Sequence, residues 1–97
     1  MQTAVDKEVG RVLRRIRFEL GQHRGREMSQ EEFGAVIGKA LGSGPYRQPT
    51  VSAWEKGEVS MSARGLVVAL RLLSEALGKQ VCYEDLLPSR TRVLTAP

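Results

Sequence analysis

"TVSAWEKGE", residues 50–58, predicts a short helix with two unlike faces. Val51 and Trp54 are three positions apart and therefore lie on one face, where the only tryptophan of the chain can anchor the helix to a core. The other side carries short side chains such as Ser52, and Gly57 is expected to end the helix. A helix with one large anchor and a slim outer surface is suited to entering a groove.

Four further helical segments surround this one, because apolar residues recur every three or four positions and no stretch alternates as a strand would. Gly21 is the expected stop of the first helix, and Ser29 with Glu32 forms a capping box at the start of the second. The expected helices are Thr3–Leu20, Ser29–Leu41, Gln48–Lys56, Ser62–Gly78 and 81–87. We therefore expect one all-α, compact five-helix domain over residues 1–88 and a flexible tail over 89–97.

The charge distribution favours a polyanionic partner. The chain of 97 residues has a formal net charge of +4, and six arginines lie between Arg11 and Arg26 against the single acid Glu19. A basic stripe on a small domain is typical of nucleic-acid binding. A solvated helix face would give the same composition, so charge alone leaves both interpretations open.

Composition argues against several other classes. One cysteine and one histidine cannot supply an intrachain disulfide or a Cys/His zinc site. No apolar run approaches the roughly 20 residues that a membrane span needs, and the mixed-charge N-terminus is unlike a signal peptide. Glu27, Glu31 and Glu32 lie where acids favour a helix dipole, rather than as a catalytic carboxylate pair. We expect a cytoplasmic protein that is not an enzyme and uses no metal or cofactor.

Three segments together resemble one family. "MSQEEFGAVIG" (28–38), "TVSAWEKGE" and the serine-started leucine helix that follows are similar to the phage-repressor and Cro-like helix-turn-helix regulators of the xenobiotic-response-element type. The similarity covers about Leu13 to Leu87. It implies a lambda-repressor-like DNA-binding domain in which a helix-turn-helix places Gln48–Lys56 in the major groove.

The resemblance also implies roles for individual residues. Gln30 matches a glutamine that binds a phosphate at the start of a helix, and Lys56 matches a residue that contacts the DNA backbone. Arg17 matches an arginine that pairs with the glutamate here numbered Glu55. The base-facing positions of the recognition helix are Gln48, Pro49, Thr50, Ser52 and Ala53, where hydroxyl groups can hydrogen-bond to bases and a methyl group can touch thymine.

The sequence departs from the family pattern in its connections. The turn Lys39–Gln48 is several residues longer than usual, and "GQHRGRE" after the first helix also reads as an extended loop. The long turn carries Tyr46 and Arg47, and we expect both residues to reach a phosphate strand that a compact turn would miss.

Two functions from different classes follow. The leading hypothesis is a sequence-specific, double-stranded DNA-binding transcriptional regulator that acts as a homodimer on a pseudo-palindromic site in the nucleoid. The alternative is an antitoxin or protein-interaction adaptor with the same fold, whose partner could bind through the C-terminal helix or tail. The arginine density near the recognition helix favours DNA, because a domain that only binds proteins does not require it.

Overall fold

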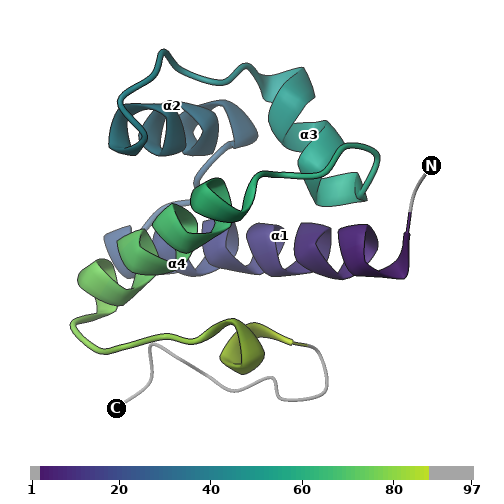
Figure 1. Cartoon of the computed structure of the whole chain (residues 1–97). Coiled ribbons are helices and arrows are strands. Elements are labelled where there is room, and N and C mark those ends of the chain that lie inside the picture. Colours follow the sequence, from purple (N-terminus) through teal and green to yellow (C-terminus); the bar gives the residue numbers. More distant parts are fainter. Residues whose placement is uncertain (1–2, 88–97) are drawn as a thin grey trace.

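The computed structural model describes residues 3–87, and these residues form helices and no strand. The elements are α1 (Ala4–Arg24), α2 (Gln30–Ala40), α3 (Gln48–Lys56), α4 (Ala63–Leu77) and the 3-10 helix η1 (Tyr83–Leu86). In Figure 1, α1 crosses the molecule with α2 and α3 on one side and η1 on the other, while α4 packs against α1 and α2. The all-helical prediction is confirmed, and the tail predicted over 89–97 lies outside the described residues.

An aliphatic core holds the four α-helices together. The fully buried side chains come from every helix, and burying each one stabilises the fold by about 1.5–3 kcal/mol. Trp54 is only 7% exposed, so it anchors α3 as predicted. The largest fully buried side chains are Val12, Leu13, Ile16, Phe33, Ile37, Val51 and Leu73. None of the helices within residues 3–87 is long and apolar enough to cross a membrane.

Side-chain caps fix where α2 and α4 begin. Ser29 Oγ accepts a hydrogen bond from the Glu32 backbone N–H at 3.0 Å, and Glu32 Oε1 accepts one from the Ser29 backbone N–H at 3.0 Å. Ser62 Oγ accepts from the Gly65 backbone N–H at 3.1 Å at the start of α4. These bonds satisfy first-turn N–H groups that have no partner within the helix. The capping box predicted at Ser29 is confirmed.

The predicted end of α1 is wrong by about one turn. The helix continues through Arg24 and ends at Gly25, whose φ of 84° is left-handed. Gly21 is buried inside the helix, where an added Cβ would lie 2.9 Å from the Met28 backbone nitrogen. It is therefore a glycine because another part of the chain passes close by, and not because the helix stops there. As a result, the first half of "GQHRGRE", which was expected to be a loop after the first helix, is helical.

The predicted fifth α-helix is also wrong, because the segment forms one short 3-10 turn. Asp85 Oδ2 accepts from the Cys82 backbone N–H at 2.9 Å and closes the turn at its start. Leu87 is already extended, with φ −72° and ψ 145°, as is usual before a proline. Too few residues remain between these two points for a ladder of α-helical hydrogen bonds. Leu86, 2% exposed, nevertheless reaches the core.

The long connection between α2 and α3 packs on the protein. The Tyr46 backbone N–H donates to the Gly34 carbonyl oxygen at 3.2 Å, and a Cβ at Gly34 would collide with the Tyr46 carbonyl oxygen. The Tyr46 ring meets Trp54 edge-on, with ring centroids 4.9 Å apart. The added residues of this turn therefore pack against both helices that they join, and they position the start of α3.

Helices α1 and α3 meet backbone to backbone. A Cβ at Gly10 of α1 would collide with the Glu55 carbonyl oxygen, and one at Gly57 would lie 2.8 Å from the Lys7 Cα. No side chain separates the two helices at this contact. The C-terminal end of α3 is therefore held directly on the N-terminal half of α1, as their adjacent ends in Figure 1 show.

Candidate nucleic-acid interface

A buried carboxylate links α1 to α3. The Glu55 side chain accepts two hydrogen bonds from Arg17, one from Nε to Oε2 at 2.8 Å and one from Nη2 to Oε1 at 3.0 Å. Arg17 Nη1 also donates to the Met28 carbonyl oxygen at 2.9 Å. The hydrogen bonds to Glu55 raise the pKa of Arg17 above its ordinary value. The pair that the family resemblance implied is thus present, and it neutralises a carboxylate that is fully buried.

Two glutamines extend this contact to the start of α3. Gln30 Nε2 donates to Glu55 Oε1 at 3.0 Å, and Gln48 Nε2 donates to Gln30 Oε1 at 2.7 Å. An ionised carboxylate only accepts hydrogen bonds, so Gln30 must turn its nitrogen to Glu55 and its oxygen to Gln48. Gln48 in turn points one N–H inward and keeps its oxygen and second N–H available. We call the sequence Arg17–Glu55–Gln30–Gln48 the polar chain.

The polar chain was not foreseen from the sequence. Each of its four residues was singled out, but only Arg17 and Glu55 were paired, and Gln30 was expected to bind a phosphate. The structure gives the Gln30 amide two partners inside the protein. Residues 30, 48 and 55 lie on different helices or different turns, so no spacing in the sequence connects them.

The outer face of α3 carries the other predicted contact residues. Pro49, Ala53 and Lys56 share one side at helical spacing, opposite the buried Val51 and Trp54. Lys56 and Pro49 are exposed, and Ala53 is half-buried. Thr50 is also exposed and Ser52 is half-buried. Apart from Lys56 at its end, this face bears no long side chain.

The last two residues before α3, Tyr46 and Arg47, differ in where their side chains lie. Tyr46 is half-buried against Trp54, so its ring serves the core. Arg47 is exposed at the N-cap of α3, and its side chain makes no capping hydrogen bond. Of the two residues considered for a phosphate contact, the structure leaves Arg47 in a position to make one.

A second carboxylate gathers two arginines near the start of α2. Glu32 Oε2 lies 3.0 Å from Arg24 Nη2 and 3.2 Å from Arg26 Nη2. The hydrogen bond from the Ser29 backbone, followed by the contact with Arg24, lowers the pKa of Glu32 to about 2. These arginines are therefore engaged in holding the connection between α1 and α2.

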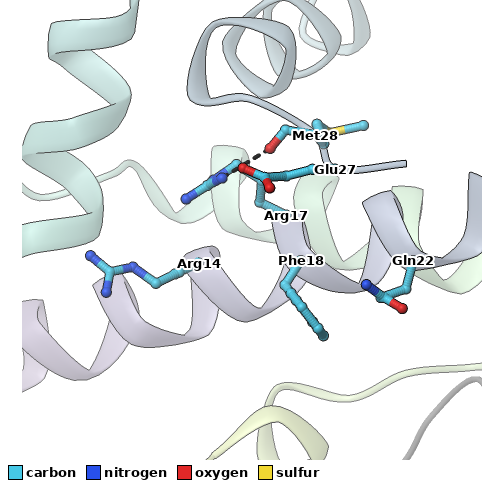
Figure 2. Close-up of a pocket in the computed structure, with 6 residues that line it drawn as sticks. All are labelled: Arg14, Arg17, Phe18, Gln22, Glu27 and Met28. Carbon is cyan, nitrogen blue, oxygen red and sulfur yellow. Dashed lines mark hydrogen bonds between the residues drawn. The ribbon is translucent and has the colours of Figure 1, made fainter. Parts of the chain in front are cut away.

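A pocket of about 250 Å³ lies between α1 and the segment that leads to α2 (Figure 2). Phe18 is 56% exposed at this pocket, and Figure 2 shows its ring pointing away from Met28. The lining residues are Arg14, Arg17, Phe18, Gln22, Glu27 and Met28. The volume is below the roughly 300–1,000 Å³ of typical small-molecule sites. Within residues 3–87 no group of histidine, cysteine, aspartate and glutamate could hold a metal ion.

The residues expected to contact DNA thus lie on or beside one helix, α3, whose first side chain is held by the polar chain. The structure brings Gln30 and Gln48 together and places Arg47 at the start of α3 and Lys56 at its end. Comparison of the chain with protein-family models, curated proteins and solved structures gave no match.

Proposed function

We propose that this protein is a sequence-specific, double-stranded DNA-binding transcriptional regulator. In this proposal α2 and α3 act as a helix-turn-helix, with the long connection as the turn, and α3 enters the major groove. The observation that carries the proposal is the polar chain, which holds the first side chain of α3 from behind while the outer face of that helix stays slim. Such preorganisation is what base recognition requires, because an ordered side chain loses little entropy on binding.

The polar chain fixes the orientation of the Gln48 amide and so gives it a preference for one base. With one N–H held by Gln30, Gln48 presents its carbonyl oxygen and its other N–H outward. This donor and acceptor pair matches the N6 amino group and N7 of adenine in the major groove. Ser52 and Thr50 are placed for further polar base contacts, and Ala53 for contact with a thymine methyl group. Gln30 then supports Gln48 in base recognition and does not bind a phosphate itself.

A homodimer is the form that suits this function. One such domain offers little surface for tight specific binding, whereas two copies read half-sites about one helical turn apart. The regulator would act on DNA in the cytoplasm.

The second candidate is a protein-interaction adaptor or antitoxin with the same fold. Its supporting observation is Phe18, a large aromatic ring that is 56% exposed beside a pocket. Exposed aromatic residues are enriched at protein interfaces. This function requires neither the polar chain nor the slim face of α3, so the two candidates depend on different surfaces.

Selection from a pool of DNA duplexes with randomised half-sites tests the leading proposal. We expect an enriched sequence that contains adenine, and Gln48→Ala should lose that preference at a cost of about 1–3 kcal/mol. Gln30→Ala should weaken the preference at the same base pair, because it frees the Gln48 amide. Gln80→Ala, an exposed glutamine beyond α4, is the matched control and should leave the preference unchanged. If the parent protein enriches no sequence, the proposal is wrong and the adaptor function gains support.

A further inference from the structure

The ion pairs divide the basic residues of α1 and of the connection after it into engaged and available cations. Arg15 pairs with Glu19 at 2.8 Å, and Arg17 is bound to Glu55, as described above. Arg24 and Arg26 both contact Glu32. Most of the arginines that suggested a polyanionic partner are therefore engaged with acids of the protein itself.

Arg14 and Lys7 belong to the available group. The Arg14 side chain is 62% exposed, and its Nε lies 3.7 Å from Glu55 Oε1, an oxygen that already accepts from Arg17 and Gln30. Lys7 is exposed and has no ion pair within the part of the chain that the structure describes. Both cations thus retain most of their capacity to bind an external anion.

Their position on α1 places them at the end of α3. Lys7, Gly10 and Arg14 follow one another at helical spacing on the same face of α1. Gly10 packs on the Glu55 carbonyl group, and Lys7 packs on Gly57. The two cations therefore flank the C-terminal end of α3, whose last residue, Lys56, is exposed.

We propose that Lys7, Arg14 and Lys56 form a cationic ledge that binds a phosphate strand of double-stranded DNA beside the groove that α3 enters. This inference rests on the proposed function and adds α1 to the binding surface. The ledge continues the outer face of α3 through Lys56, so a strand bordering the groove passes alongside it. Lys7 and Arg14 carry flexible or forked cationic groups that bind phosphate oxygens regardless of sequence.

The dependence of DNA affinity on salt tests the ledge. The probe is a mixed-sequence DNA duplex two helical turns long, and the full chain carries Lys7→Ala, Arg14→Ala or both. Each lost phosphate contact should reduce the steepness of log K against log salt by about 0.9, and the double variant should lose about twice as much. Arg14→Lys keeps the charge and should retain most of the slope, although it cannot reproduce the geometry toward Glu55.

Matched controls separate the ledge from general charge effects. Lys79→Ala and Arg71→Ala remove the same charges from exposed positions at and beyond the second half of α4, which lies away from α3 in Figure 1. These controls should leave the slope close to that of the parent. Thermal unfolding of each variant identifies any loss of fold. Lys7→Ala is the decisive variant because, within residues 3–87, the Lys7 side chain makes no hydrogen bond or ion pair that the fold would lose.

The outcomes distinguish the ledge from the proposed function. If the parent binds DNA and both ledge variants keep the parent slope, the ledge is wrong and the recognition role of α3 stands. If the parent fails to bind any duplex, both the ledge and the proposed function are wrong. If the ledge variants lose affinity only for an acidic protein partner, the surface serves a protein and the ledge as proposed is overturned.

Discussion

Glu55 and Glu32 both form ion pairs with arginine, yet they do so in opposite environments. The Glu55 side chain is fully buried and links α1, α2 and α3 through the polar chain. The Glu32 side chain is 35% exposed and fastens the short connection before α2. Paired charges in water contribute little to stability, whereas a buried charge that loses its partner is costly. The burial of each glutamate side chain, and not the number of arginines near it, therefore determines how much its ion pairs matter for stability.

Removing the buried acid should have the largest effect. Glu55→Ala leaves the Arg17 guanidinium without its carboxylate partner and deprives Gln30 of an acceptor, so the free energy of unfolding should fall by about 3–5 kcal/mol. Denaturant unfolding followed by circular dichroism measures this loss. Glu55→Gln, which keeps the shape, should lose less. An Ala variant as stable as the parent would show that the polar chain contributes nothing to the fold.

Replacing both partners should cost less than the two single losses suggest. The double variant Arg17→Met with Glu55→Leu removes both charges from the interior, so no unpaired ion remains. A double-mutant cycle on the free energy of unfolding should give a coupling of about 2 kcal/mol, within the usual range for residues in contact. If the losses of the two single variants simply added in the double variant, Arg17 and Glu55 would not interact directly. Glu55 would then not differ from Glu32 in the strength of its ion pair.

The exposed acid should matter less. Glu32→Ala removes half of the capping box and two solvent-screened ion pairs, and we expect the free energy of unfolding to fall by clearly less than it does in Glu55→Ala. The same denaturant measurement applies, with Glu31→Ala as a control on the neighbouring exposed acid of the helix start. A loss as large as that of Glu55→Ala would mean that burial does not separate the two sites.

The smallest effect should be a change of stability with pH. The pKa of Glu32 is lowered from an ordinary 4.5 to about 2, so its stabilising contribution is complete above about pH 4.5 and is lost as the pH falls toward 2. Glu32→Gln cannot titrate and should show a flatter decline of melting temperature across that window. Parallel curves for the parent and the variant would show that the carboxylate is not held by Ser29 and Arg24.

The helices were largely predictable because local signals agree with packing. The capping box at Ser29 and the anchor Trp54 followed from spacing alone, and the boundaries of α3 were correct. Gly21 misled the prediction because a glycine that permits close packing and one that ends a helix look alike in sequence. The prediction of an α-helix around Asp85 failed for another reason. The residues there are compatible with a helix, but the segment is too short to form one.

The candidate site was less predictable than the fold. Arg17 and Glu55 were paired through the family resemblance. The short side chains on the outer face of α3 made this helix the candidate for entering a groove. The link from Gln30 to Gln48 depends on the packing of α2 against α3 and has no local signal. The division of the arginines likewise depends on which acids the fold brings near them, so the total charge of the stripe could not reveal that Arg14 and Lys7 remain available.

The backbone contact at Gly10 has a consequence for how this protein can evolve. Because α1 and α3 touch there without side chains between them, any larger residue would push α3 away from its seat. Substitutions at Gly10 therefore cannot change the tilt of α3 in small steps. If α3 reads DNA as proposed, new recognition preferences would arise by exchanging the outward side chains of α3 while its angle is inherited unchanged. Related proteins with different targets should then vary at positions such as Gln48 and Ser52 and keep the glycine.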